Sequence, residues 1–188
     1  EFPKEWLPAF HLLDEVWTPS EFISQNLRKY TDKPVYTLPY SVTAPADAAY
    51  DRDYFHLPKD RFLFLMMYDS GSGMVRKNPL GAIENIRTKL DGYDNIYFIC
   101  ETLSKTAVNS LTACVDVFVS LHRAEGFGLV MAEAMLLGTP VIATNWSANT
   151  EFMNRESACM VDYKKTAIEQ DIPPFKKGYH WAEADVAQ

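Results

Sequence analysis

Apolar runs alternate with helix-like stretches along this chain from residue 61 onward. Each run is about as long as a buried strand, and a segment of helical length follows most of them. Strands are expected at residues 62–67, 95–100, 115–120, 141–144 and 158–161. Continuous apolar strands separated by helices indicate a mainly parallel sheet with helices on both faces. We therefore predict an α/β, Rossmann-like domain whose ligand groups gather at the carboxyl ends of its strands.

The predicted helices have recognisable starts and stops. One spans residues 78 to about 90, Ser104 caps the next, Gly138 ends a helix over 131–137, and a short helix lies near 149–154. Upstream, residues 15–18 and 35–38 have the pattern of short strands, and Ser20 caps a helix between them that extends to about residue 30. Residues 39–53 form a connection punctuated by prolines.

Composition indicates an ordinary globular protein. Among 188 residues, 47% are hydrophobic and 23% charged, which argues against disorder. The net charge of −7 disfavours a general nucleic-acid or anionic-membrane binder. Cys100, Cys114 and Cys159 lack metal-ligand spacing and lie in or beside apolar segments, so we expect buried thiols in a reducing cytosol. No secretory signal or membrane-spanning run appears in the sequence.

Two carboxylates bracket a Gly-x-Gly turn between a predicted strand and a predicted helix. Glu125 precedes Gly126 and Gly128, and Glu133 lies inside the helix that follows. The first N–H groups of such a helix lack intrahelical partners and its dipole favours an anion, which suits a phosphate. The glycines allow close backbone approach and dihedrals barred to other residues. Glu125 would face the sugar end of a ligand, and Glu133 could accept from the vicinal hydroxyls of a ribose.

Two basic side chains, Arg76 and Lys77, follow the first core strand and precede a helix with Pro79 near its first turn. A cation here could neutralise a diphosphate as it becomes a leaving group. Adjacent side chains point in different directions, so only one is expected to reach a ligand fully. The simpler alternative is a solvated Arg-Lys pair at a helix start.

These segments resemble the E-x7-E signature of retaining glycosyltransferases of the GT-B fold, in particular family 4 (glycosyl transferases group 1). The segments that carry the resemblance are residues 14–22, 76–79, 120–133 and 138–144. The resemblance implies the C-terminal, donor-binding half of that fold. It also implies that Lys77, with Arg76 second, holds the diphosphate. Glu125 would lie near the reacting carbon of the donor sugar, and Glu133 would bind the ribose.

The resemblance adds further residues that would contact the nucleotide sugar. They are Gly126, Phe127, Gly128, Leu129, Glu101, Leu103 and His122. Glu101 and Leu103 follow a predicted strand, where the family holds the base mainly with backbone groups. Each side chain has a structural alternative: His122 as a core or ion-paired histidine, Glu125 as a partner of Arg123, and Glu133 as a bonded polar residue in an apolar helix.

The extent of the resemblance divides the chain. Residues 1–42 resemble the end of the N-terminal acceptor domain and the interdomain linker, and residues 43–188 the donor domain, incomplete at its C-terminus. A strand and helix of the family have no counterpart near residues 83–94, so one βα unit is either missing from the sequence or naturally deleted. The chain alone is expected to bind nucleotide without transferring sugar.

The resemblance implies retaining transfer of a hexose from a nucleoside diphosphate sugar to a glycan or lipid-linked acceptor, in bacterial surface polysaccharide synthesis. GDP-mannose is the favoured donor and a UDP-sugar the alternative, with no tightly bound cofactor, no metal and no nucleic-acid partner. It further implies a cytoplasmic location, with peripheral membrane association through the missing domain. One rival is a non-catalytic nucleotide-sugar-binding or scaffolding module. Another is a Rossmann dehydrogenase, but no Gly-x-Gly-x-x-Gly follows the first strand.

Overall fold

The computed structural model of the chain describes residues 2–69, 71, 73–89 and 95–185. The N-terminal unit contains the 3-10 helix η1 (Lys4–Leu12), strand β1 (Val16–Thr18), helix α1 (Glu21–Leu27) and strand β2 (Val35–Thr37). The two strands pair in parallel, and Phe10, Leu27 and Val35 form the core of the unit. The predicted cap is confirmed, because the Ser20 side chain accepts from the amide of Ile23. The helix ends earlier than predicted, at Leu27.

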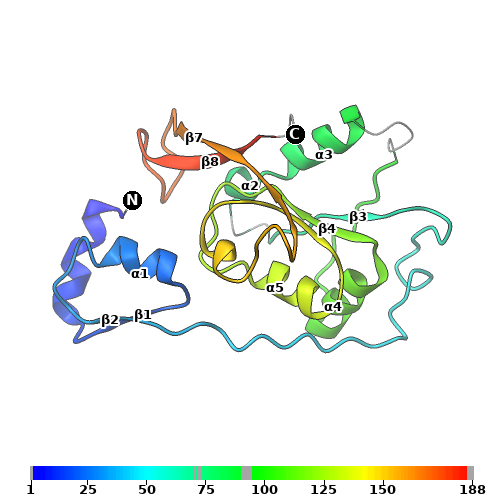
Figure 1. The fold of residues 1–188 in the computed structure, drawn as a ribbon, viewed down its shortest axis with the longest axis horizontal. Coiled ribbons are helices and arrows are strands. Elements are labelled where there is room, and N and C mark those ends of the chain that lie inside the picture. The colour runs from blue at the N-terminus through cyan, green and yellow to red at the C-terminus, as the bar shows by residue number, and fades with distance from the viewer. Residues whose placement is uncertain (1, 70, 72, 90–94, 186–188) are drawn as a thin grey trace.

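The main body is a parallel sheet of four strands in the order β3-β4-β5-β6. They are β3 (Phe64–Leu65), β4 (Val117–Ser120), β5 (Val141–Thr144) and β6 (Cys159–Val161). Figure 1 shows the N-terminal unit beside this body, joined to it by a long extended connection along the lower edge. The predicted α/β class is therefore confirmed, and β5 has the predicted bounds.

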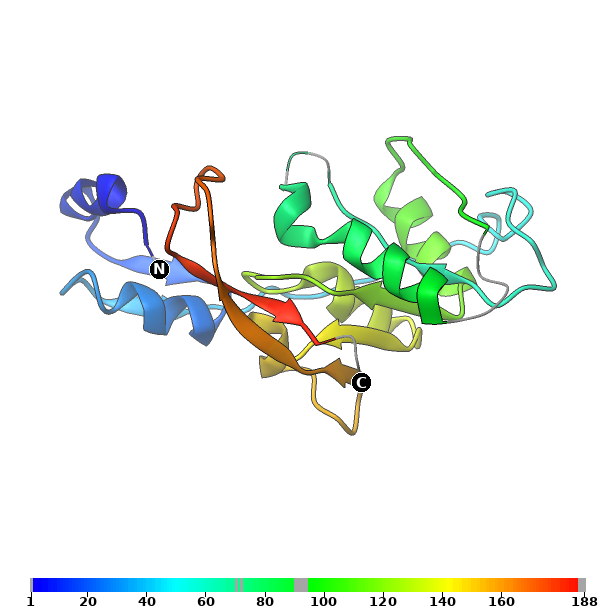
Figure 2. The same ribbon diagram turned by 90° about the horizontal axis from the view of Figure 1, so that it is seen from above.

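Helices cover both faces of this sheet, as predicted. Phe118 of β4 points toward α5 (Leu129–Leu136), where it packs with Met131 and Ala134. The flanking Val117 and Val119 pack on the opposite side in the cluster that includes Ala82 of α3 (Pro79–Lys89). Helix α4 (Lys105–Cys114) lies on the α5 side, and the Ser104 cap is confirmed by its bond from the Ala107 amide. Figure 2 shows α3 set apart from α5 across the sheet.

The strand predicted at residues 95–100 is wrong. These residues carry no strand, and Phe98 is 75% exposed. A strand forms only when its backbone groups find partners in a ladder, and within the described residues β3 pairs with β4 alone. An apolar sequence without a neighbouring strand therefore stays outside the sheet. The connection suspected of lacking a βα unit includes residues 90–94, which lie outside the described residues.

Sequence reasoning also missed an antiparallel hairpin near the end of the chain. Strands β7 (Tyr163–Ala167) and β8 (His180–Ala184) pair over their whole length. The backbone amide of Ala182 donates to the Arg123 carbonyl, so β8 lies against the loop that follows β4. Two short elements complete the fold, α2 (Met74–Lys77) and the 3-10 helix η3 (Ala148–Glu151), which lies close to the predicted helix at 149–154.

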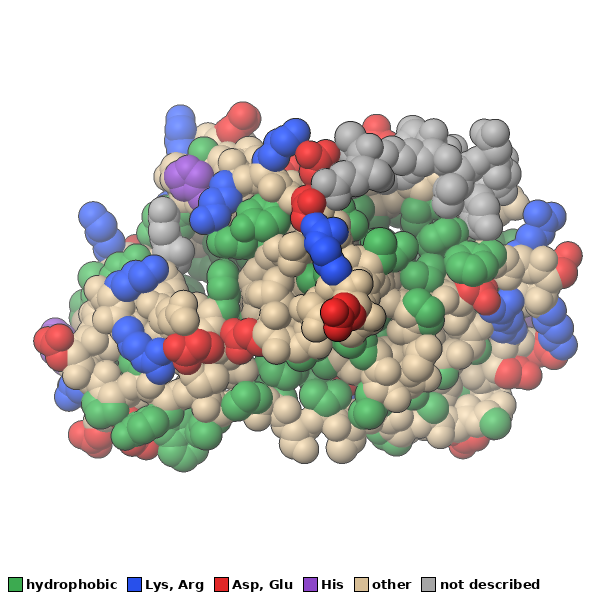
Figure 3. Space-filling model, viewed as in Figure 1, with side chains coloured by type: hydrophobic (Ala, Val, Ile, Leu, Met, Phe, Trp, Pro, Cys, Tyr) green, Lys and Arg blue, Asp and Glu red, His purple; other side chains and the backbone are tan. Residues whose placement is uncertain are grey.

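The surface departs from expectation at the cysteines. Cys100 and Cys159 are exposed and Cys114 is half-buried, so the prediction of buried thiols is wrong for two of the three. Apolar side chains also gather along the lower edge of the N-terminal unit in Figure 3. Among the exposed apolar side chains of this unit, Trp17 of β1 and Tyr36 of β2 are paired in register and are 65% and 49% exposed. In the described part of the chain, no helix combines the length and apolarity needed to cross a membrane.

Candidate functional site

The loop between β4 and α5 forms the centre of the site. Gly128 has φ +92°, which favours glycine, and a Cβ there would lie 2.6 Å from Met131 Cε. Gly126 has no positive φ. A Cβ on Gly126 would lie 3.1 Å from Ile23 Cδ1, so this glycine allows close packing of α1. The expectation of a special dihedral is therefore right at Gly128 and wrong at Gly126.

Helix α5 presents free amides at the end of this loop. The first of its amides to bond within the turn is that of Met131, which donates to the Gly128 carbonyl at 3.0 Å. The amides of Leu129 and Val130 precede that bond, and among the described residues no side chain caps this end of the helix, so an anion could bind there. Within the loop, the Gly126 carbonyl accepts from Ser20 Oγ at 2.7 Å, which ties α1 to the site.

An ion-pair cluster lies beside the loop. Lys77 Nζ contacts Glu125 Oε1, and Arg76 Nη1 lies 3.1 Å from the same oxygen and 2.7 Å from the Ala124 carbonyl. The side chains of Glu125, Lys77 and Arg76 are only 10%, 16% and 19% exposed. The solvated Arg-Lys pair considered from the sequence is therefore not what the structure contains. Both cations converge on one carboxylate.

Arg123 connects the helix that carries this cluster's two cations, α2, to strand β8. Its guanidinium forms two bonds to Glu183 of β8, at 2.6 and 2.9 Å, and its backbone amide donates to the Arg76 carbonyl. A third bond joins Arg123 Nη1 to the Val75 carbonyl. Arg123 thus fixes α2 against the hairpin, and the alternative pairing of Glu125 with Arg123 is wrong.

A cavity of about 540 Å3 opens over the loop. Glu125, Arg76 and the segment 126–129 line it on one side, while Pro19, Ile23 and Tyr40 of the N-terminal unit line the other. Lys77 reaches the cavity only through Glu125, since it does not itself line the space. The Phe127 ring packs edge-on against Tyr40, with centroids 5.2 Å apart. The predicted residues Phe127 and Leu129 therefore do face the same space as Glu125 and Arg76.

Glu133 lies apart from this cavity. It is 4% exposed, and its carboxylate pairs with Lys105 Nζ at 2.5 Å. Lys105 is the first residue of α4, directly after the segment that contains Glu101 and Leu103. Glu101 is exposed, whereas Leu103 packs with Phe55 and Ala107. Glu133 therefore pairs with Lys105 and does not line the cavity over the loop.

His122 is buried between the end of β4 and the segment that follows β5, and it does not line the cavity. Its Nδ1 lies 3.1 Å from the Ser120 hydroxyl and carbonyl, and its Nε2 lies 3.1 Å from Asn149 Oδ1 and 3.2 Å from the Trp146 carbonyl. This geometry suits a neutral imidazole that donates from Nε2 and accepts from the Ser120 hydroxyl. Burial lowers the pKa of His122, although the nearby Glu125 opposes the shift. In this arrangement His122 positions the 146–149 loop.

The buried histidine should make stability depend on pH. Its folded pKa is below its unfolded value near 6.5, so the unfolded chain binds the proton more tightly. His122 should not reduce the free energy of unfolding above pH 6.5. Below pH 6.5 the free energy of unfolding should fall, because the unfolded chain takes up the proton first. Urea unfolding between pH 8 and 5.5 should show a smaller loss for His122→Gln than for the unmodified chain. Replacing the exposed His11 in the same way should leave the loss unchanged; equal slopes for all three proteins would contradict the assignment.

Sequence reasoning missed several positioning residues. Ser147 Oγ accepts from the Glu125 amide at 2.9 Å, and Ser147 holds φ +75°, a strained value for a residue with a side chain. The Glu151 carboxylate accepts from the amides of Glu21 and Phe22, so η3 caps α1. Through Ser147 and Glu151, the segment after β5 thus contacts both the loop at Glu125 and the N-terminal unit. Among the described residues, no group of three or more His, Cys, Asp or Glu side chains could hold a metal ion.

The fold and the site define an α/β domain of the GT-B type with a glycine-containing loop between β4 and α5. The chain belongs to the family described as glycosyl transferases group 1, whose model matches residues 71–172. A curated relative, "Putative glycosyltransferase ORF313" of Acidianus filamentous virus 1 (isolate United States/Yellowstone), is 29% identical over 158 residues. That match covers 78% of this chain and 50% of the relative. The chain thus spans about half the length of the curated relative it matches.

Solved structures show the same fold at low sequence identity. Anabaena Alr3699/HepE, in complex with UDP and glucose, matches with a TM-score of 0.71 and 13% identity, over 86% of this chain and 54% of that one. Sucrose-phosphate synthase from Thermosynechococcus elongatus matches with a TM-score of 0.65 and 20% identity, over 85% and 49%. WaaG, a glycosyltransferase involved in lipopolysaccharide biosynthesis, matches with a TM-score of 0.58 and 14% identity, over 78% and 48%.

Proposed function

We propose that residues 43–188 are the donor-binding half of a retaining hexosyltransferase of family 4, and that residues 1–42 belong to the acceptor domain and linker. One observation carries this proposal: two cations and Glu125 meet at the loop whose Gly128 opens the free N-terminus of α5. That arrangement provides positive charge and free amides for a diphosphate, and a carboxylate next to them for a sugar.

The mechanism follows from these charges. In the free protein Glu125 pairs with both Lys77 and Arg76, so the cluster of one carboxylate and two cations keeps a net positive charge. A bound diphosphate would share these cations with Glu125 and would accept from the Leu129 and Val130 amides. As the bond between the sugar C1 and the phosphate oxygen breaks, negative charge grows on the phosphate, where these groups stabilise it. The acceptor oxygen then bonds to C1 on the same face, and its proton passes to the leaving phosphate oxygen, which explains retention without a separate base.

The rival, a non-catalytic binding module, would be favoured if Lys77 and Glu125 did not face a common cleft. Arg76 and Glu125 line one cavity, which supports the enzymatic proposal, whereas Lys77 contacts Glu125 without lining that cavity. For the donor, the extended segment 120–129 favours GDP-mannose and a role in bacterial surface polysaccharide synthesis. The UDP in the HepE complex makes a UDP-sugar the alternative. The acceptor is proposed to be a glycan or a lipid-linked glycan, with peripheral membrane association contributed by the acceptor domain.

Nucleotide binding tests the proposal directly. Calorimetry with GDP, UDP and ADP should show one preferred nucleoside diphosphate, and Glu133→Ala should weaken its binding by about 1–3 kcal/mol because charge-assisted bonds to the ribose are lost. The fold should survive, since alanine favours helix and the half-exposed Lys105 can turn to water.

The matched control is Glu84→Ala, which removes an exposed carboxylate from α3. It should leave the affinity unchanged. Unchanged affinity after Glu133→Ala would remove the ribose role, and no binding of any of the three nucleotides would remove the proposed function.

A further inference from the structure

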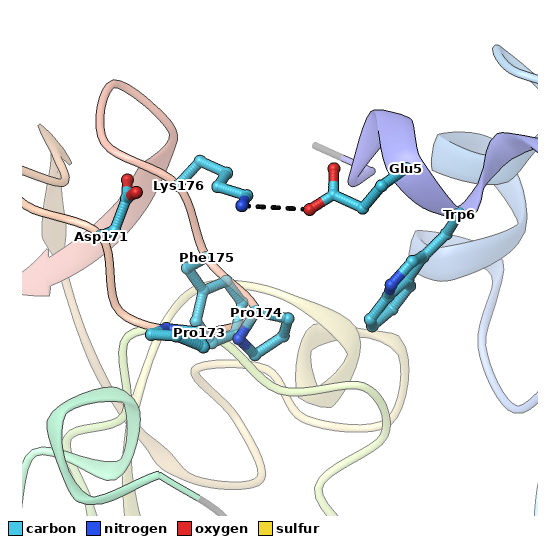
Figure 4. Close-up of a pocket in the computed structure, with 7 residues that line it drawn as sticks. All are labelled: Glu5, Trp6, Asp171, Pro173, Pro174, Phe175 and Lys176. Atoms are coloured by element: carbon cyan, nitrogen blue, oxygen red, sulfur yellow. Dashed lines mark ion pairs between the residues drawn. The ribbon is translucent and has the colours of Figure 1, made fainter.

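A second cavity lies between the N-terminal unit and the tip of the β7–β8 hairpin. Its volume is about 560 Å3, within the range of roughly 300–1,000 Å3 for small-molecule sites. In Figure 4 the Trp6 side chain projects from η1 on one side of the cavity. Pro173, Pro174 and Phe175 of the hairpin tip lie on the other side. The ion pair between Glu5 and Lys176, at 3.1 Å, spans the space between the two walls.

The hairpin tip is held in a defined shape against the N-terminal unit. The Lys177 amide donates to Asp171 Oδ1 at 2.8 Å, and the amides of Ile172 and Phe175 each bond to the other's carbonyl. Tyr179 then donates its hydroxyl to the Phe2 carbonyl at 3.3 Å. The two walls are therefore connected by both an ion pair and a hydrogen bond, and the cavity is part of the folded arrangement.

The lining chemistry favours an amphipathic, uncharged ligand. Trp6 and Phe175 offer aromatic rings with electron-rich faces, which attract the slightly positive C–H bonds of a sugar ring. Glu5, Asp171 and Lys176 add acceptors and donors for hydroxyl groups. Two carboxylates outnumber one ammonium here, so an anionic ligand would be repelled. Planar apolar walls with a few polar groups at the rim match a neutral saccharide.

Phe175 connects this cavity to the site at Glu125. The same residue lines both spaces, so the hairpin tip forms part of the wall that separates them. The two cavities therefore adjoin at Phe175, and a sugar bound at Trp6 would lie next to the site at Glu125.

We propose that the cavity between Trp6 and the hairpin tip binds a neutral sugar unit of the acceptor glycan, distal to the reacting hydroxyl. The inference rests on the proposed function, because it takes the Glu125 loop as the place of reaction. It assigns the β7–β8 hairpin a role in recognising the acceptor.

The test uses the 188-residue chain and the indole N–H signals of its four tryptophans in NMR spectra. Trp6→Phe identifies the signal of Trp6. Maltotriose, cellotriose and mannotriose are the neutral probes, and trigalacturonate is the anionic one. At least one neutral trisaccharide should shift the Trp6 signal saturably and leave Trp17 unshifted, while trigalacturonate should not bind.

Trp6→Ala should weaken binding of that trisaccharide roughly tenfold, because the stacking surface is lost. The matched control is Trp17→Ala, another exposed tryptophan, which should change the affinity less than about twofold. A chain that binds a nucleoside diphosphate but shows no saturable Trp6 shift with any neutral probe overturns this inference alone. Preference for trigalacturonate, or equal effects of the two variants, also overturns it. A chain that binds neither nucleotide nor saccharide loses the proposed function as well.

Discussion

Replacing Arg76 and Lys77 together by alanine is expected to destabilise the chain by about 3–5 kcal/mol. The change leaves the Glu125 carboxylate, 10% exposed, without either of its cations, and an uncompensated buried charge costs about that much. Either single substitution should cost clearly less, because the remaining cation still pairs with Glu125. Urea unfolding monitored by tryptophan fluorescence measures the difference.

Adding Glu125→Gln to the double variant separates charge from packing. Glutamine keeps nearly the same shape and removes the charge, so the triple variant should recover much of the lost stability. A control pair on the surface, Lys59 and Asp53, has side chains 68% and 63% exposed, and Lys59→Ala should have little effect. If the double and triple variants were equally unstable, the cluster would not be held together by charge.

The elements that the sequence predicted well are those whose burial is decided locally. β5 and α5 are short, apolar and bounded by Gly138 and Pro140, and the structure places them close to where the pattern did. The segment 95–100 has an equally apolar pattern, but it forms a strand only if a neighbouring strand is there to pair with it. The local sequence does not reveal whether such a neighbour exists. The β7 strand has the opposite character. Its exposed polar residues give no apolar signal, and it exists through pairing with β8.

The same distinction separates the site residues that were foreseen from those that were not. Glu125 and Gly128 lie in one short motif, so their proximity follows from sequence spacing. Tyr40, Lys105 and Phe175 come from distant segments and reach the site through the fold. Lys105 could have been foreseen from the sequence. It directly follows the Ser104 cap, and the segment before that cap was already expected near the nucleotide base.

The last expected result is that this chain binds nucleotide but transfers sugar far more slowly than a longer polypeptide in which it is joined to an acceptor-binding domain. Positioning two reactants can lower a barrier by roughly 7–11 kcal/mol, and that requires the attacking oxygen to be held close to C1. A sugar bound at Trp6 leaves the reacting end of the acceptor free to move, so it supplies little of this effect. The open cavity also leaves the departing diphosphate partly in water, where Lys77 and Arg76 stabilise it less than in a closed site. Assays of both proteins with GDP-mannose, UDP-glucose and a panel of glycan acceptors compare them directly. Turnover by the chain alone near the rate of the longer polypeptide would contradict this expectation and would show that the donor half orients its acceptor unaided.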